Sequence, residues 1–308
     1  MNAALEKIKA HAKTLDFCAM GVTQTLEPPH YKDYLNWIDQ GYHQNMWYLA
    51  EASRKAKRAS AAHLLPNVQS ILVGALSYHS HTRHRQDAIK FARYGWGADY
   101  HSFVKDRFTQ LCQYMTEDLG LSFDAKITVD TAPVLERDFA LLAGVGWMGK
   151  NTMIMNQKNG SYIYLGAMLT SLDLPSDAPV TAHCGSCTAC IDTCPTQAIE
   201  EPFKLNPSKC ISYHTIENKT ADIPESIKAH LHGWVAGCDI CQDVCPWNRK
   251  AAPGEARETH QLDHASLNAH DILNMDEASY KNVFAKTAFA RIPLAKLKQN
   301  VKAALDLP

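Results

Sequence analysis

Cysteine spacing is the feature that most limits what this chain can fold into. Eight of its ten cysteines fall between positions 184 and 245 of the 308 residues. The first group reads CGSCTACIDTCP over residues 184–195, with spacings of two, two and three residues and a proline after the last cysteine. The second begins with an isolated cysteine at 210 and ends with CDICQDVCP over residues 238–246. This clustering indicates metal ligation more than disulfide formation.

The first spacing is the pattern of bacterial ferredoxins with two 4Fe-4S clusters, in which the cysteine before the proline binds the other cluster. The sequence therefore predicts two clusters with crossed ligands. The expected ligands are Cys184, Cys187, Cys190 and Cys245 for one cluster and Cys194, Cys210, Cys238 and Cys241 for the other. Structural zinc is the alternative, but zinc sites commonly use two separated cysteine pairs, so the triplet favours iron-sulfur clusters. By itself the pattern predicts electron transfer but does not identify the reaction that uses the electrons.

Composition and charge narrow the class of protein. The formal net charge is −1 and 46% of the residues are hydrophobic, which is typical of an ordinary globular chain. No apolar run approaches the roughly 20 residues that span a bilayer, and the start, MNAALEKIKAHAKTL, has no signal-peptide core. We therefore expect a cytoplasmic protein without a membrane partner. We also expect Cys18 and Cys112, which lie in apolar stretches, to be buried packing residues. An RNA partner would need a local basic patch, since the whole chain is nearly neutral.

Hydrophobic periodicity predicts a mixed helix and sheet body, in which α/β and α+β architectures both remain open. Helices are expected at residues 2–15, 104–119 and 134–144, and strands at 17–22, 70–78, 123–130 and 161–172. The proline-bearing stretch DLPSDAPV then leads to the cysteine segment. We predict three parts: a body over residues 1–178, a two-cluster domain over 179–250, and a helical segment over 251–308.

Asp130 lies in the stretch VDTAPVLER, at the end of an expected strand and before a helix that Thr131 and Pro133 would open. Reactive groups in folds of alternating strands and helices often lie at the carboxyl ends of strands. An aspartate that caps the next helix is equally consistent with this position. Position alone leaves both interpretations open.

The stretch GVGWMGKN at residues 144–151 matches the glycine spacing of two nucleotide-binding motifs, the dinucleotide loop and the phosphate loop. A dinucleotide loop needs a strand before the first glycine, where a helix is expected here, and a phosphate loop needs Ser or Thr in place of Asn151. We therefore do not expect nucleotide binding. Its backbone amides and Lys150 can still grip an anionic or amide-rich group, or a large flat cofactor.

Two basic runs, RKAKR at residues 54–58 and HTRHR at 81–85, have aromatic residues near them in sequence. Such runs are usually solvated surface, and the aromatics can be ordinary core. An unstacked RNA base beside basic side chains is the alternative.

Five stretches together resemble the epoxyqueuosine reductases: VDTAPVLER, GWMGKN, CGSCTACIDTCPTQAI, KCISYHTIE and CDICQDVCPWNR, in this order. The resemblance extends from the N-terminal helix to about Lys250 and more faintly to the end. It implies an α+β fold: a nitroreductase-like cobalamin-binding domain, a bacterial ferredoxin-like two-cluster domain and a short helical segment. It also implies the reaction of that family, which removes the epoxide oxygen from epoxyqueuosine at the wobble position of tRNA, the last step of queuosine biosynthesis. The implied cofactors are cobalamin and two 4Fe-4S clusters. An external donor would supply the electrons.

The resemblance assigns the proton donor to Asp130. A carboxyl group that donates a proton near neutral pH needs a raised pKa, which we expect from burial against the corrin ring and an apolar pocket. Cobalamin contacts are expected from Arg58 and, less directly, Asp130 itself. Weaker candidates for such contacts are Tyr100, Lys150, Asn151 and Ser212.

Many family members continue into helical repeats of the HEAT type, and we expect this chain to be a monomeric short form without them. Its tRNA would then be held by the basic runs and the ferredoxin face. Two other functions remain as alternatives: a cobalamin enzyme of the reductive dehalogenase type acting on a small substrate, and a non-catalytic electron-transfer protein. The absence of a twin-arginine signal disfavours the first, and the balanced charge disfavours the second.

Overall fold

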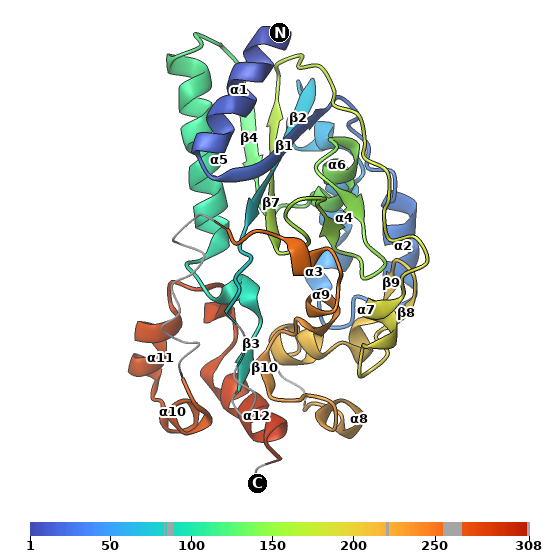
Figure 1. The fold of residues 1–308 in the computed structure, drawn as a ribbon, viewed down its shortest axis with the longest axis vertical. Helices are drawn as coiled ribbons and strands as arrows, with labels where there is room; N and C mark the ends of the chain where they lie inside the picture. Colours follow the sequence, from blue (N-terminus) through green and yellow to red (C-terminus); the bar gives the residue numbers. More distant parts are fainter. Residues whose placement is uncertain (83, 85–88, 220–221, 255–266, 307–308) are drawn as a thin grey trace.

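The computed structural model describes residues 1–82, 84, 89–219, 222–254 and 267–306. Its upper part in Figure 1 is built on a four-stranded sheet whose neighbouring strands are all antiparallel, in the order β1-β2-β7-β4. The strands are β1 (Phe17–Thr23), β2 (Ser70–Ser77), β7 (Ile163–Thr170) and β4 (Ala125–Thr128). β4 is a short edge strand, and the chain leaves it at the end of the sheet nearest the cysteine segment.

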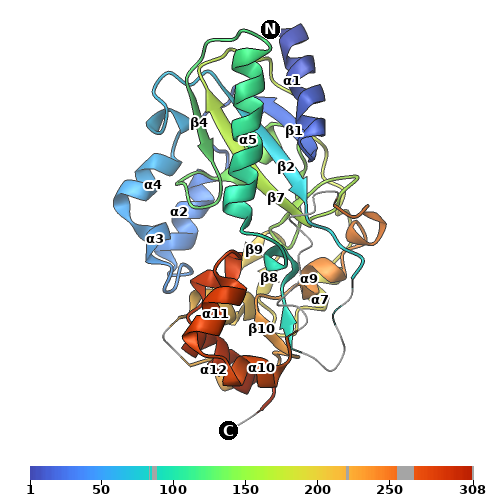
Figure 2. The same cartoon turned by 90° about the vertical axis from the view of Figure 1, so that its left-hand side faces the viewer.

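Helices cover both faces of this sheet. The flanking helices are α1 (Asn2–Thr14) and α5 (Tyr100–Glu117), which Figure 2 shows side by side on one face, and α6 (Glu136–Leu142) on the other. Leu72 and Leu76 of β2 pack with α1 and α5, whereas Ile71 and Val73 pack with Phe139 of α6. All eight residues of β2 are therefore buried, which explains why this strand is almost continuously apolar in sequence.

Two glycines let α5 approach the sheet closely. Gly74 of β2 pairs directly with Gly166 of β7. A Cβ on Gly166 would lie 2.7 Å from the ring of Phe108 on α5, and a Cβ on Gly74 would lie 3.0 Å from the same ring. This close packing fixes the position of the first turn of α5, which carries functional residues described below.

Short elements make up the remainder of the body. They are α2 (Tyr31–Asp39), α3 (Trp47–Ala50), α4 (Ala52–Arg58), η1 (Ala61–His63), β3 (Lys90–Phe91), η2 (Arg93–Gly95), β5 (Trp147–Met148) and β6 (Ile154–Met155). The cysteine segment is also built from short elements, as its composition indicates. They are α7 (Ala189–Asp192), β8 (Ile199–Glu201), β9 (Lys204–Leu205), η3 (Pro207–Lys209), η4 (Tyr213–Glu217), α8 (Glu225–Lys228), β10 (Trp234–Ala236), α9 (Ile240–Asp243) and η5 (Asn248–Lys250).

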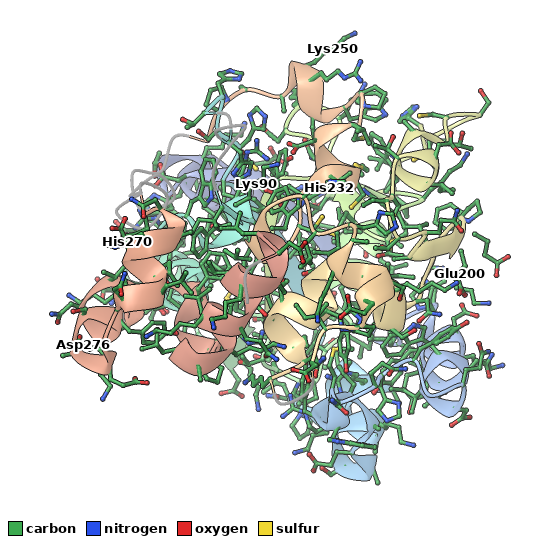
Figure 3. All side chains as sticks on the ribbon, turned by 90° about the horizontal axis from the view of Figure 1, so that it is seen from below. Lys90, Glu200, His232, Lys250, His270 and Asp276 are labelled. Carbon is green, nitrogen blue, oxygen red and sulfur yellow. The ribbon has the colours of Figure 1, made fainter. Side chains whose placement is uncertain are left out.

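The C-terminal helices pack on the cysteine segment and share one core with it. These helices are α10 (Ala269–Asn274), α11 (Glu277–Phe284), η8 (Ala288–Arg291) and α12 (Leu294–Ala304). The core also contains Phe91 and Trp96 from the body and Val235 from β10. β3 pairs in parallel with β10, and Lys90 Nζ, seen beside His232 in Figure 3, donates to the His232 carbonyl at 2.8 Å. The three-part division remains a prediction, but residues 89–96 physically join its parts.

The sequence-based elements are largely confirmed, with two local corrections. The expected strand at 123–130 covers only Ala125–Thr128, and the helix expected to open at Thr131 begins at Glu136. Pro133 disfavours helical conformation in Ala132, and Leu135, with a ψ angle of 72°, is itself outside the helix. Among the described helices, none has the length and apolarity needed to cross a membrane.

Candidate active site and cluster-binding cysteines

Asp130 lies in the loop between β4 and α6, in an unusual backbone conformation. Its φ angle is 48°, in the left-handed region that aspartate tolerates better than most side chains do. Its backbone N–H donates to Glu136 Oε1 at 2.7 Å, which holds the loop in this conformation. A non-glycine residue held at positive φ costs about 1–3 kcal/mol and is common at functional sites.

The first turn of α5 meets the Asp130 carboxylate. Tyr100 Oη donates to Asp130 Oδ2 at 2.9 Å, and His101 Nε2 lies 3.1 Å from the same oxygen. The other ring nitrogen of His101, Nδ1, lies 2.6 Å from Asp99 Oδ1. Asp130 caps no helix, because the N-cap of α6 is Leu135, without a side-chain cap. The capping interpretation of Asp130 is therefore wrong.

The prediction of a raised pKa for Asp130 is also wrong in this structure. Partial burial acts to raise the pKa, but the hydrogen bonds from His101 and Tyr100 and the charge of His101 bring it below its ordinary value. The Asp130 side chain is half exposed, and although burial is the largest single effect on its pKa, the lowering effects together outweigh it. Asp130 is thus an ionised carboxylate near neutral pH.

Two neighbours of Asp130 have raised pKa values that the sequence did not reveal. Burial, reinforced by the charge of Asp130, raises the pKa of Glu136 to about 8. The pKa of His101 is raised to about 9, since its contacts with Asp130 and Asp99 outweigh its burial. Groups whose environments separate their pKa values in this way are typical of sites that carry out acid and base chemistry.

We expect the protein to lose stability as the pH rises from about 6.5 to about 9. The pKa of His101 is about 9 in the folded state and near 6.5 in the unfolded state. Its stabilisation is therefore complete below pH 6.5 and disappears as the pH passes the folded value, by about 1–2 kcal/mol for a partly exposed group. Glu136 adds a loss of the same sign between about 4.5 and 8. Anaerobic urea unfolding of wild type and His101→Gln across this range isolates the histidine contribution, and parallel curves would contradict it.

Stacked tyrosine rings pack beside the site. The rings of Tyr100 and Tyr164 stack with centroids 4.9 Å apart, and Tyr164 stacks in turn on Tyr78 at 4.4 Å. Tyr164 Oη donates to the Tyr94 carbonyl at 2.7 Å. Burial raises the pKa of Tyr100 and Tyr164. Tyr78 directly follows β2, Tyr94 lies on η2, Tyr100 begins α5 and Tyr164 lies on β7. Their spacing in sequence therefore gave no sign that they meet.

None of the eight clustered cysteines forms a disulfide in the described part of the chain. Burial raises the pKa of Cys190, and the charges of Cys184, Cys245 and Cys187 act in the same direction. Burial likewise raises the pKa of Cys241, with contributions from Cys210 and Cys194, and that of Cys238, with contributions from Cys241 and Cys210. Because such charge effects need proximity, the cysteines named together here lie near one another. The ligand assignment itself remains a prediction.

The two predicted cysteine sets lie next to each other. The charge of Cys190 acts on Cys241, so the two sets are adjacent, as a relay of electrons requires.

Lys150 and Asn151 connect the body to the cysteine segment. Lys150 Nζ donates to the carbonyls of Gly185 and Cys187 at 2.8 and 2.9 Å. Asn151 Nδ2 donates to the Cys241 carbonyl at 3.3 Å. Their role as cobalamin contacts stays a prediction, whereas their structural role is to fix the cysteine loops against the body.

Arg58 and Ser212, the remaining predicted cofactor contacts, lie on other elements than Asp130. Arg58 is buried in α4, with its guanidinium 5.5 Å from the centre of the Tyr34 ring and Nη1 3.4 Å from the Arg54 carbonyl. Ser212 lies at the start of η4, two residues after Cys210. The structure therefore brings Tyr100 to Asp130 but does not place Arg58 in direct contact with it.

A buried ion-pair network joins the body to the second cysteine group. Arg93 Nη1 lies 3.2 Å from Asp239 Oδ2 and 2.7 Å from Asp243 Oδ1, and both carboxylates flank cysteines. Tyr162 Oη donates to the same Asp243 oxygen at 2.6 Å. Sequence reasoning missed Arg93, because its partners lie about 150 residues further along the chain.

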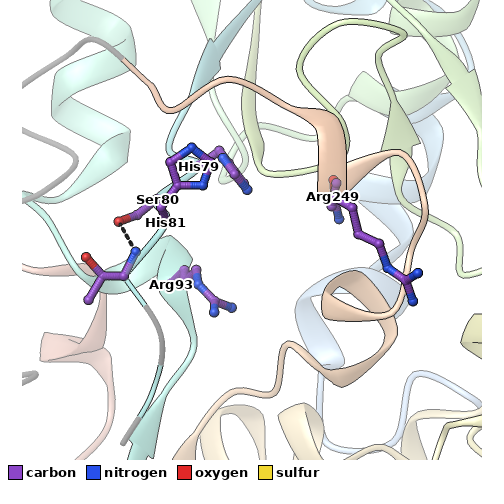
Figure 4. A pocket seen from close by; sticks show the side chains of 7 residues that line it. His79, Ser80, His81, Arg93 and Arg249 are labelled. Carbon is purple, nitrogen blue, oxygen red and sulfur yellow. Dashed lines mark hydrogen bonds between the residues drawn. The ribbon is translucent and has the colours of Figure 1, made fainter.

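A polar cavity of about 260 Å³ lies beside this network and does not include Asp130. Figure 4 shows His79, His81 and Arg93 along one side of the cavity and Arg249 along the other. The cavity therefore belongs to the junction between body and cysteine segment and not to the site around Asp130.

Arg93→Met should destabilise the fold by about 3 kcal/mol, because it leaves the buried Asp239 carboxylate without its cation. The variant should also bind less iron, since Asp239 and Asp243 lie in the loop of the second cysteine group. Anaerobic urea unfolding and iron analysis measure both effects. Arg107→Met is the matched control, as the Arg107 ion pair with Asp16 is more exposed and should contribute less than about 1 kcal/mol. Equal effects of the two substitutions would contradict this account.

Comparisons with known proteins match both parts of the chain. A family model described as "4Fe-4S double cluster binding domain" matches residues 183–248, and one described as "Epoxyqueuosine reductase QueG, DUF1730" matches residues 58–131. The epoxyqueuosine reductase of Atelocyanobacterium thalassa is 34% identical, covering 99% of this chain and all of that protein. The epoxyqueuosine reductase of Synechocystis is 38% identical, over 88% of this chain and 93% of that protein.

A solved structure agrees with these matches. A crystal structure of epoxyqueuosine reductase with an epoxyqueuosine-modified tRNA-Tyr stem loop has a TM-score of 0.87 and 28% identity, covering 99% of this chain and 81% of that chain. Full-length identity above 30% and a shared fold establish the relationship. The chain belongs to the epoxyqueuosine reductase family of oxidoreductases.

Proposed function

We propose that the chain reduces epoxyqueuosine to queuosine at the wobble position of tRNA, the last step of queuosine biosynthesis. Electrons from an external donor would pass through two 4Fe-4S clusters to cobalamin, and a proton would reach the departing oxygen through the Asp130 carboxylate. The observation that carries this proposal is the contact of Asp130 with Tyr100 and His101 at the end of the sheet that faces the cysteine segment.

The surroundings of Asp130 suit the amide-rich rim of cobalamin. Arg54 Nη2 donates to the carbonyl of Thr131 at 2.7 Å, beside Asp130. Arg54 Nε is buried and has no hydrogen-bond partner among the described residues. A buried donor without a partner is costly, and the amide side chains of a corrin ring offer acceptors for it. Cobalamin, when bound, supplies the low-potential reducing centre that reduction of an epoxide to an alkene requires.

The chain's own residues supply positioning and protons. Reduction of an epoxide to an alkene takes up two electrons and two protons, breaks two C–O bonds and releases the oxygen as water. The half-exposed Asp130 can reach a leaving oxygen, while Tyr100 and the positive φ angle hold its carboxylate in one orientation. General acid catalysis of this kind contributes about 10²–10⁴ in rate.

Exposed aromatic and basic side chains near Asp130 suit an anticodon loop. Trp47 and Tyr48 are the large exposed aromatics of α3, and they precede the basic run in α4. Tyr48 Oη donates to Glu217, which also pairs with Arg291 at 2.7 Å, so α3, η4 and η8 meet near Asp130. Aromatic faces beside cations bind unstacked bases. Part of the second basic run, including Arg83 and Arg85, lies outside the described residues.

The proposal places the enzyme in the cytoplasm, as a monomer that acts on tRNA. It is tested by anaerobic reconstitution with cobalamin, iron and sulfide, followed by incubation with a reductant and an epoxyqueuosine-containing tRNA stem loop. Mass spectrometry should show a nucleoside that has lost one oxygen atom. Persistence of the epoxide with fully loaded protein would overturn the proposal.

A further inference from the structure

His101 is the most unusual titratable group at the site, because both nitrogens of its ring face carboxylates. Nδ1 lies 2.6 Å from Asp99 Oδ1, and Nε2 lies 3.1 Å from Asp130 Oδ2. A neutral imidazole carries one N–H, so its other nitrogen would direct a lone pair at an anionic oxygen. Only the doubly protonated ring donates to both carboxylates. The geometry therefore calls for an imidazolium between Asp99 and Asp130.

Local structure fixes the ring in this position. Asp99 caps α5 by accepting from the His101 backbone N–H at 3.1 Å, and its own N–H donates to the Lys286 carbonyl at 2.8 Å. The His101 ring also stacks on Tyr100 with centroids 4.1 Å apart. Asp99 thus holds both the backbone and the ring of His101, which leaves Nε2 directed at Asp130.

The charged and titratable groups around His101 favour its protonated form. Asp99 and Tyr100 face it from the start of α5, and Asp130 and Glu136 face it from the loop after β4 and from α6. Arg291 of η8 lies beyond Asp130 and acts on that carboxylate. Carboxylates therefore outnumber cations around the ring, and the pKa of His101 is raised to about 9.

We infer that His101 stores the proton that Asp130 delivers, in an Asp99–His101–Asp130 relay. The inference rests on the proposed function, in which each turnover consumes two protons. The proton moves from His101 Nε2 to Asp130 Oδ2 and from Asp130 to the departing oxygen. The exposed part of the His101 ring then takes up a proton from solvent, so a second passage through the relay supplies the second proton that the oxygen needs to leave as water. The two electrons enter one at a time from the clusters. His101 is a positioning residue that acts through Asp130, and Asp99 acts through His101.

Protonation of His101 can be measured without the reaction. Long-range ¹H–¹⁵N NMR of histidine-labelled protein, with clusters oxidised, should show both His101 nitrogens protonated up to a pH of about 9. The resonance is assigned by its loss in His101→Gln. In Asp99→Asn, which keeps a neutral cap for α5, the transition should move toward about 6.5. A wild-type transition near 6.5 would overturn the inference, whatever the activity of the enzyme.

Kinetics then separate a proton relay from a merely structural role. In single-turnover reactions, wild-type rates should be nearly constant up to about pH 8 and fall as His101 deprotonates near 9. His101→Gln keeps a donor to Asp130 but stores no proton, so its rate should fall about 10-fold or more and lose this decline near pH 9. Asp99→Asn should move the decline to lower pH.

His11→Gln is the matched control, because His11 also stacks on a tyrosine, Tyr114, with centroids 3.8 Å apart near the other end of α5. It should leave both the rate and the pH profile unchanged. Wild-type turnover with an unchanged profile in His101→Gln would overturn the relay alone. Absence of turnover in wild type would instead overturn the proposed function.

Discussion

Asp130→Asn is expected to keep its cofactors and fold but to turn over about 10²–10⁴ times more slowly than wild type. Asparagine can still accept the hydrogen bond from Tyr100 through its carbonyl oxygen, so the loop should keep its shape. It cannot accept a proton from His101 and pass it on. The measurement is single-turnover formation of queuosine, with iron and cobalamin contents determined on the same samples.

Two control variants make the Asp130 result specific. Asp124→Asn makes the same change just before the other end of β4, where Asp124 accepts from Asn67 at 2.7 Å, and should retain full activity. Glu136→Gln tests the other carboxyl group near the site. Because the pKa of Glu136 is about 8, glutamine imitates its protonated form and should have a small effect. Near-normal turnover in Asp130→Asn with a large loss in Glu136→Gln would transfer the role of acid to Glu136.

Paired cysteine substitutions should reveal the crossed ligands through iron content. Cys190 and Cys245 belong to one predicted cluster, so the double variant with alanine at both positions should lose about four of about eight irons. Cys190 and Cys194 are close in sequence but belong to different clusters, so their double alanine variant should lose nearly all iron. The physical reason is that each cluster needs all four of its thiolates.

The opposite order of iron contents would show that each cysteine group binds its own cluster. Low-temperature EPR of the reduced protein counts the remaining clusters independently of iron analysis. Cys18→Ala and Cys112→Ala are the matched controls, because these thiols contact Ala75 and Met168 within the body. Both should retain full iron content.

Much of the fold follows from local sequence signals. The apolar run that forms β2 and the helical stripe of α5 are long and regular, and Gly120 follows α5 with a φ angle of 63°, as expected for a helix end. The pairing of β3 with β10 could not be predicted, since it joins two- and three-residue strands more than 140 residues apart. Its stability comes from a shared core and not from local preference.

The candidate site likewise contains residues that the sequence predicts and residues that only the fold reveals. The cysteines and Asp130 were identifiable because their chemistry depends on residue type and spacing along the chain. His101 and Glu136 were not identified as site residues, because their importance arises only when the first turn of α5 meets the loop after β4. The pKa of Asp130 was mispredicted for the same reason: burial was foreseen, but the two donors that oppose it were not. The cobalamin contact predicted for Arg58 stays a prediction, and the structure adds that its guanidinium lies over the Tyr34 ring.

The most direct test of the central claim is the wobble nucleoside of tRNA from a strain that accumulates epoxyqueuosine. Expression of this chain should convert epoxyqueuosine to queuosine, seen by mass spectrometry as loss of one oxygen, and expression of Asp130→Asn should not. Unchanged epoxyqueuosine in cells that contain iron-loaded wild-type protein and cobalamin would contradict the account.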